Sequence, residues 1–293
     1  MDHAGDFSFV IDFKKGEGNP RRVFDAASEL IDAFQAFDKA ILPSIGPKME
    51  TAIVLEQVEA GSMKAVFCTL LKKVDDEALR SVDIRKMIGP FLVDAKYAML
   101  RFLDDEQRAK ANIEPLKDEL QVLARRTEVR HLPDYAPVHE GRLIAAMDKV
   151  QKAKAELETG DEMVIDLGPR KYKVDISQTW LPSENLEEVP QGLIEKENSS
   201  EVFLTIRKPD LIKNTMWQFS HGKATVNASI KDQDWLRRLH DREIGIYAQD
   251  ALLCTMRTVY TYDENGELID TKSEIVKVHE IKPAHDKQDD FLF

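Results

Sequence analysis

A loop rich in glycine and basic residues near the start of the chain could bind an anion. Residues 14–22 read Lys-Lys-Gly-Glu-Gly-Asn-Pro-Arg-Arg and lie between an alternating apolar run and a helical pattern. The first turn of a helix has free backbone amides and the positive end of the helix dipole, and both favour a bound phosphate. The loop is therefore a candidate phosphate or nucleotide site, and the alternative is an ordinary turn with solvated side chains.

A second loop, at residues 59–62, would open on the same edge if the two N-terminal strands were parallel, because the two loops would then form a crevice. The loop at 14–22 is neither a Walker loop nor a complete dinucleotide fingerprint, and Glu17 would repel phosphate. The residues that we assign to this site are Lys14, Lys15, Gly16, Gly18, Arg21, Arg22 and Ser62.

The last six residues, Gln-Asp-Asp-Phe-Leu-Phe, place three large apolar side chains after a polar segment that offers them no core. A glutamine, a spacer and closely spaced apolar residues resemble the short motif by which bacterial replication and repair proteins bind the sliding clamp. The resemblance implies that Gln288 forms a hydrogen bond at the pocket entrance. It also implies that Phe291, Leu292 and Phe293 fill apolar pockets as anchors. Asp289 departs from the motif, which commonly has leucine there.

The same segment also resembles the acidic tail of bacterial single-stranded-DNA-binding proteins. That resemblance implies a basic pocket on the partner that captures the last aromatic side chain together with its α-carboxylate. The alternative to both interpretations is a tail that folds back on its own domain or stays disordered.

Other patterns with possible chemistry fit structural roles better. Residues 263–267, Asp-Glu-Asn-Gly-Glu, lack the spacing of a calcium loop because Leu268 stands where an EF-hand requires glycine; Asn-Gly between alternating runs predicts a hairpin turn instead. We also read residues 221–223 as a turn. The seven histidines show no metal-ligand spacing, and we find no nucleophile elbow, so we assign no catalytic residue, metal or cofactor.

The remaining aromatic and sulfur side chains are expected in the core. Trp180, Trp217 and Trp235 are interpreted as core residues, with stacking on nucleic-acid bases as the alternative. Cys68 and Cys254 lie in apolar patterns and are expected to be buried thiols, not a disulfide or zinc ligands.

The 53 acidic and 41 basic residues give a net charge of -12, which opposes non-specific attraction to nucleic acids and anionic membranes. The longest apolar runs are too short to span a bilayer, and residues 1–6 lack the features of a signal peptide. We therefore expect a cytoplasmic protein with no membrane partner, for which direct nucleic-acid binding is disfavoured.

In the first half, alternating Phe7, Phe9, Ile11 and Phe13 predict a strand, and Asn19-Pro20 predicts the start of a helix over residues 20–42. A second strand at 51–58, followed by a helix that Ser62 caps, would repeat this unit. Helical patterns continue from residue 75, over 84–103, over 106–125 and over 138–157.

After residues 158–161 the pattern changes to short strands. We predict strands over 163–167, 171–176, 202–207, 216–221, 224–230, 252–262 and 268–281, with a long surface loop over 183–200 and a helix over 232–240. A small barrel or a sandwich would fit this order.

We therefore predict an α+β protein with two domains and a tail. Residues 1–158 would form a helix-rich α/β domain with two strand-loop-helix units, residues 159–282 a mainly antiparallel β domain, and residues 283–293 a flexible tail. The function that we favour is a non-enzymatic prokaryotic adaptor that recruits a protein partner through its tail, linked to DNA replication, repair or mobile elements. The alternatives are an enzyme or sensor that binds a phosphate-containing molecule at residues 14–22, or a purely structural or oligomeric subunit.

Overall fold

A computed structural model confirms the α+β class and divides the chain into two compact units. The first unit comprises Met1–Arg130 and Pro137–Gln191, and the second comprises His131–Ala136 and Gly192–Phe293. The structure describes residues 7–14, 18–45, 50–59, 63–73, 84–105, 112–127, 136–186, 193–211, 216–222, 224–247, 249–263 and 266–284.

The first unit is built on a five-stranded antiparallel sheet with the strand order β2-β3-β1-β4-β5. The strands are β1 (Phe7–Asp12), β2 (Glu50–Glu59), β3 (Met63–Lys73), β4 (Glu162–Asp166) and β5 (Lys171–Val174). The alternation predicted for β1 is confirmed: Phe7, Phe9 and Ile11 are buried, whereas Ser8 and Val10 between them are partly exposed. One face of the sheet therefore carries the core.

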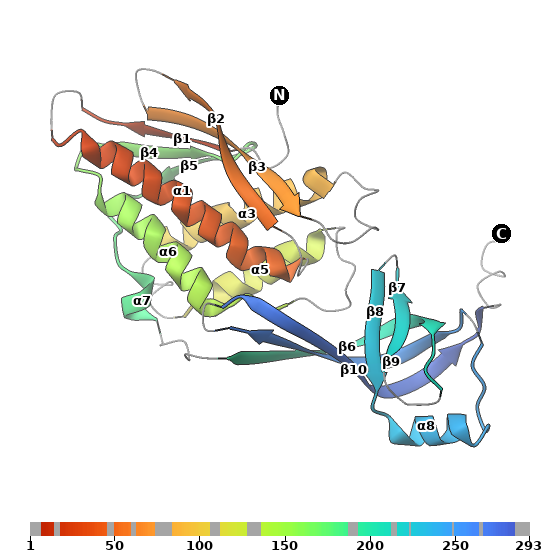
Figure 1. The fold of residues 1–293 in the computed structure, drawn as a ribbon. Helices are drawn as coiled ribbons and strands as arrows, with labels where there is room; N and C mark the ends of the chain where they lie inside the picture. The colour runs from red at the N-terminus through yellow and green to blue at the C-terminus, as the bar shows by residue number, and fades with distance from the viewer. Residues whose placement is uncertain are drawn as a thin grey trace. The chain divides into compact units, whose positions relative to one another are not determined.

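Helices lie on one side of the sheet (Figure 1), and α1 (Arg21–Ile41) and α3 (Ile84–Asp104) contact its strands. The other helices described in this unit are the short 3-10 helix η1 (Leu42–Ser44), α5 (Glu114–Arg126), α6 (Glu140–Ala155) and the single turn α7 (Pro182–Asn185). α1 packs along α6, and α3 packs against α5. α1 begins at Arg21, one residue after the predicted start, and Asn19 Oδ1 accepts a hydrogen bond from Arg21 N at 3.0 Å.

The helix predicted after Ser62 is wrong, because Met63–Lys73 form strand β3. β3 forms a hairpin with β2 and also pairs with β1, and Phe67 stacks on Phe7 and Phe9 with ring centroids 5.2 and 5.3 Å apart. A short apolar run fits helical and strand periods alike, and here the neighbouring strands decide the outcome. The first predicted strand-loop-helix unit is therefore present as β1 and α1, whereas the predicted second one is the β2–β3 hairpin.

The domain boundary predicted at residues 158–159 is also wrong. β4 pairs with β1 from Ser8↔Asp166 to Asp12↔Glu162, and β5 continues the same sheet. The change to strand periodicity near residue 160 thus marks the return of the chain to the first sheet.

The second unit contains a closed five-stranded barrel with the order β10-β8-β7-β6-β9 (Figure 1). Its elements are β6 (Ile194–Lys208), β7 (Trp217–His221), β8 (Ala224–Ile230), α8 (Gln233–His240), β9 (Ala251–Tyr262) and β10 (Leu268–Lys282). β8 and β10 are parallel, and the other neighbouring strands are antiparallel. The barrel is thus the correct member of the predicted pair, barrel or sandwich.

The surface loop predicted over residues 183–200 is wrong at both ends, because residues 182–185 form α7 and β6 begins at Ile194. Residues 195–201 are all charged or polar, so the sequence shows no alternation of apolar and polar residues that would predict a strand here. Their backbone pairs with β9 as far as Ile194↔Tyr262. The core residues of the barrel are Val202, Leu204, Ile206, Trp217, Phe219, Val226, Ala228, Ile230, Trp235, Leu236, Leu252, Cys254, Met256, Ile275 and Val278.

Candidate functional site

The loop predicted to bind phosphate leads to a buried ion pair between Arg22 and Asp161. Arg22 Nε donates to Asp161 Oδ2 at 2.9 Å, and Arg22 Nη2 donates to Asp161 Oδ1 at 3.0 Å. The side chains are 6% and 2% exposed. Arg22 Nη1 also donates to Asn19 O at 3.0 Å. The guanidinium group therefore joins the start of α1 to the residue before β4.

Asp161 is stabilised in its ionised form by these partners. The hydrogen bond from Arg22 is the largest cause that lowers its pKa, and it acts against burial. The backbone N–H of Glu158, which donates to Asp161 Oδ2 at 3.0 Å, lowers the pKa further. A carboxylate of the chain itself thus occupies the fork of Arg22 that a phosphate would use.

Gly18 has a structural role in this arrangement. Its φ of +69° is in the left-handed region, which favours glycine. A Cβ atom at this position would collide with the Glu158 carboxylate and lie 2.9 Å from Arg22 Nη1. The predicted turn therefore requires glycine so that Glu158 and Arg22 can approach the backbone.

The other residues assigned to this site are arranged as follows. Arg21 is exposed and pairs with Asp25 at 3.0 Å, so it remains at the surface. Lys14 belongs to the described part of the loop, whereas Lys15, Gly16 and Ser62 lie outside the described residues.

The strand register brings the end of β1 beside the starts of β3 and β4, because Ile11 pairs with Met63 and Asp12 pairs with Glu162. The strands are antiparallel, so the parallel crevice that we considered is not formed. Sequence reasoning missed Glu158 and Asp161 just before β4, because we interpreted that segment as a domain boundary.

A second buried ion pair joins α1 to α3. Lys96 Nζ donates to Asp38 Oδ1, and the two side chains are 1% and 0% exposed. Lys96 Nζ also lies 5.6 Å from the ring centroid of Phe7 and 5.7 Å from that of Phe34. Burial, the largest cause, raises the pKa of Asp38, although Lys96 opposes this shift. Within the described residues, no donor reaches Asp38 Oδ2.

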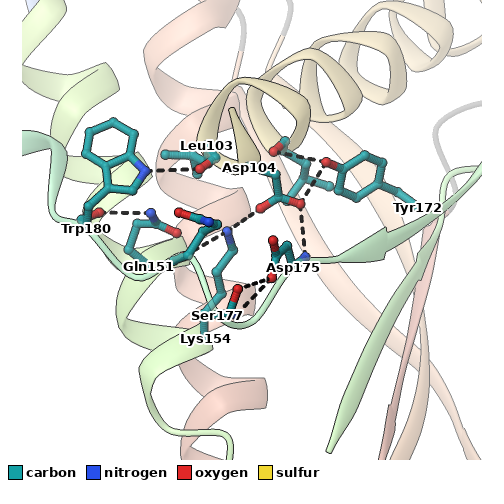
Figure 2. A network of polar contacts seen from close by, with 10 residues as sticks. Leu103, Asp104, Gln151, Lys154, Tyr172, Asp175, Ser177 and Trp180 are labelled. Atoms are coloured by element: carbon teal, nitrogen blue, oxygen red, sulfur yellow. Dashed lines mark hydrogen bonds and ion pairs between the residues drawn. The ribbon is translucent and has the colours of Figure 1, made fainter. Parts of the chain in front are cut away.

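A third polar network is centred on Asp104 at the end of α3 (Figure 2). Its Oδ1 accepts a hydrogen bond from Lys154 Nζ at 2.5 Å. Its Oδ2 accepts from the Tyr172 hydroxyl at 2.8 Å and from Asp175 N at 3.0 Å. Asp104 therefore connects α3, α6, β5 and the segment after β5.

Burial shifts the pKa values of two groups in this network, Lys154 and Tyr172. Desolvation lowers the pKa of Lys154, which is fully buried, although Asp104 acts in the opposite direction. Burial and the hydrogen bond to Asp104 raise the pKa of the Tyr172 hydroxyl. General acid–base catalysis can use a lysine with a lowered pKa beside a carboxylate. Ion pairs that only stabilise the fold shift pKa values in the same way.

The geometry around this network favours a structural role. Gln151 Nε2 donates to Trp180 O at 2.8 Å, and Trp180 Nε1 donates to Leu103 O at 3.1 Å (Figure 2). Lys154 Nζ also lies 3.3 Å from Gln178 O. These contacts bind residues 175–181 to α3 and α6. These contacts stabilise the fold of this segment, and we assign no reaction to them.

The structure also describes two of the tryptophans, one cysteine and one turn that were predicted from the sequence. Trp217 and Trp235 are buried in the barrel core, as predicted, with ring centroids 6.0 Å apart. Cys254 is also buried, and burial raises the pKa of its thiol to about 12. The side chain of Cys68 lies outside the described residues. Asp263 and Gly266 form the predicted turn, in which Gly266 N donates to Asp263 O at 2.9 Å.

Across the described parts of the chain, no three His, Cys, Asp or Glu side chains form a group that could hold a metal ion. Among the helices described, none has the length and apolar character needed to cross a membrane. Gln288, Phe291, Leu292 and Phe293 lie beyond residue 284, outside the described residues. No protein-family model, curated protein or solved structure matches the chain.

Proposed function

We propose that the protein is a non-enzymatic adaptor that recruits a partner protein through residues 288–293. The structural observation that supports this proposal most directly is a hydrogen bond that holds residue 284, four residues before the motif, against the barrel. Ala284 N donates to Asp250 Oδ1 at 3.2 Å, and Tyr247 N donates to Asp250 Oδ2 at 2.7 Å. Asp250 is buried. The start of the C-terminal segment is therefore tied to the barrel.

The motif supplies the chemistry of recruitment. In the clamp-type resemblance Phe291, Leu292 and Phe293 are anchors in apolar pockets, and in the other resemblance a basic pocket captures the last aromatic side chain with its α-carboxylate. Aromatic anchors carry much of the binding energy of short motifs. Gln288 would add a hydrogen bond at the rim. The partners that fit are a bacterial sliding clamp or a protein with a basic pocket for the last aromatic residue, in the cytoplasm of a prokaryote. The proposed roles are therefore DNA replication, repair or mobile-element biology.

The barrel itself has a topology that other proteins use for binding. Around the barrel the strands pair in the order β6-β7-β8-β10-β9, and in the chain α8 lies between β8 and β9. This is the Greek-key order of the OB-fold, whose second and third strands in chain order often face the ligand. Here those strands are β7 and β8, and their exposed or partly exposed residues include Gln218, Thr225 and Asn227.

Gln218, Thr225 and Asn227 are polar and uncharged, whereas a single-strand-binding groove presents cations and aromatic platforms. A fold alone does not assign a function. We therefore assign the barrel the role of presenting the motif, and direct nucleic-acid binding is not part of the proposal.

The alternative function at residues 14–22 is not favoured by any contact described above, because the guanidinium group of Arg22 already donates two hydrogen bonds to Asp161.

To test the adaptor proposal, the full chain and a chain that ends at residue 287 would be immobilised and compared for binding of a purified bacterial sliding clamp. They would also be compared for capture of proteins from a bacterial lysate. The proposal expects a specific partner that only the full chain binds. Identical binding by both chains would contradict it.

A further inference from the structure

Two exposed aromatic side chains lie close to the point where the C-terminal segment leaves the barrel. The first is Tyr247, which is 77% exposed. The carboxylate of Asp250 accepts hydrogen bonds from Tyr247 N at 2.7 Å and from Ala284 N at 3.2 Å. One buried carboxylate therefore holds the backbone of Tyr247 next to the start of the C-terminal segment.

The second aromatic side chain is Phe203 of β6, which is 44% exposed. Lys282 Nζ lies 4.7 Å from the centroid of its ring. Lys282 is the last residue of β10 and pairs with Ala251, which follows the buried carboxylate in the chain. We call Tyr247, Phe203 and Lys282 the exit patch, because contacts or the chain itself join each of them to the end of β10.

The loop that carries Tyr247 is held in a defined conformation. Asp250 N donates to Tyr247 O at 3.2 Å, in addition to the bond in the opposite direction. Gln249 has a φ of +73°, which is unusual for a residue other than glycine. A side chain on an ordered backbone loses less entropy on binding, and aromatic side chains are enriched at protein interfaces. Single exposed apolar residues are common, so Tyr247 is significant because of its place beside the C-terminal segment.

The length of the chain after Ala284 limits where a recruited partner can lie. Gln288 follows Ala284 by four residues, and four extended residues span at most about 14 Å. A protein that holds residues 288–293 therefore brings its own surface within that distance of the exit patch. A tether this short gives effective concentrations of the order of millimolar, so contacts too weak to form alone add to the affinity.

We propose that a clamp-type partner that holds residues 288–293 also contacts the exit patch, with Tyr247 and Phe203 packed against the rim of its pocket. This inference rests on the proposed function and extends it from a linear motif to a composite surface. The charge of Lys282 favours the clamp-type partner, because an ammonium group close to the tail repels a basic pocket and fits a neutral or acidic rim. The barrel thus supplies part of the contact as well as the tether.

Binding of a purified bacterial sliding clamp tests this inference. Biolayer interferometry would compare the full chain with an N-acetylated peptide of residues 283–293 and with the full-chain variant Phe203→Ala/Tyr247→Ala. We expect the peptide and the variant to bind about tenfold more weakly than the full chain, because both lack the aromatic contacts of the barrel. Tyr247→Ala alone should show part of this loss. Since Tyr247 is largely exposed, this single variant separates the contact from any change in stability.

Ile269→Ala is the matched control. Ile269 is 57% exposed and lies near the start of β10, whereas Lys282 ends that strand, so this variant should bind as the unchanged chain does. A peptide as tight as the full chain, or variants with unchanged affinity, would overturn the contact and leave recruitment through the tail intact. Tighter binding by the variants would also overturn it, because the tail would then pack on the patch in the free protein. Absence of binding by both the full chain and the peptide would overturn the proposed function, and this inference with it.

Discussion

Arg22 and Asp161 are 139 residues apart in the chain, yet two hydrogen bonds of 2.9 and 3.0 Å join them in a buried position. They hold the start of α1 against the start of β4, and β4 completes the first sheet. Loss of one partner of a buried ion pair leaves the other charge without compensation. The basic loop that resembles an anion site is therefore part of the framework of the first unit.

Substitution of Arg22 should destabilise the protein, whereas substitution of its neighbour should not. We expect Arg22→Gln to lower the melting temperature of the first unit by several degrees, because Asp161 would stay buried without its partner. Arg21→Gln is the matched control, since Arg21 is 78% exposed. Differential scanning calorimetry measures both. Equal, small effects of the two substitutions would show that the Arg22 pair does not support the fold.

Acid should remove the contribution of Asp161. Its pKa is lowered in the folded protein, chiefly by Arg22, so the unfolded chain binds protons more readily as the pH falls. The stabilisation is therefore complete above the ordinary carboxyl pKa of about 3.9 and is lost as the pH falls through the folded pKa. We expect Asp161→Asn to be less stable at neutral pH and to lose less stability on acidification. Urea unfolding at a series of pH values measures this, and parallel pH curves would contradict it.

The Asp38–Lys96 pair should show strong coupling in a double-mutant cycle. Lys96→Met leaves a buried carboxylate, and such changes cost about 3–5 kcal/mol of unfolding free energy. The double variant Asp38→Leu/Lys96→Met replaces both charges with apolar groups and should be close to the wild type in stability. Urea unfolding of the single and double variants gives the coupling. Additive losses would show that the two residues do not act as a pair.

Asp232 should stabilise the barrel by more than an ordinary helix cap. Its side chain accepts hydrogen bonds from Trp235 N at 3.2 Å and Val278 N at 3.0 Å, and it lies 3.2 Å from Lys277 Nζ. A lost cap costs about 1 kcal/mol, and the orphaned amide of Val278 adds roughly 1–3 kcal/mol. We expect Asp232→Ala to destabilise the barrel clearly. Asp234→Ala, at an exposed position of the same helix, should change stability by less than about 0.5 kcal/mol.

The sequence predicts local elements well where one pattern dominates. The alternation of β1, the start of α1 at Asn19-Pro20 and the helix over α3 are all visible in it. It fails where long-range pairing decides: residues 63–70 fit a helix until β1 and β2 flank them, and the charged start of β6 becomes a strand because β9 pairs with it. The partner of Arg22 was hidden for the same reason, since only the β1–β4 register brings Asp161 near.

Extension of the chain beyond Phe293 should distinguish the two kinds of partner. A clamp-type pocket binds Gln288 and the apolar side chains, so a few residues added after Phe293 should not weaken binding. A pocket of the kind used by single-stranded-DNA-binding-protein tails needs the α-carboxylate, and an extension would remove its charge-assisted hydrogen bonds. Surface plasmon resonance with the extended and unextended chains measures the difference. Binding that changes in neither the extended chain nor a Gln288→Ala variant would exclude both interpretations.

The most direct test of the adaptor proposal combines binding and stability measurements on one variant, Phe291→Ala/Phe293→Ala. We expect it to lose the partner that the full chain captures, because both aromatic anchors are gone. Its melting temperature should equal that of the wild type, since the proposal places these side chains outside the core of the protein. A variant that keeps its partner, or whose melting temperature falls by several degrees, would contradict recruitment through residues 288–293.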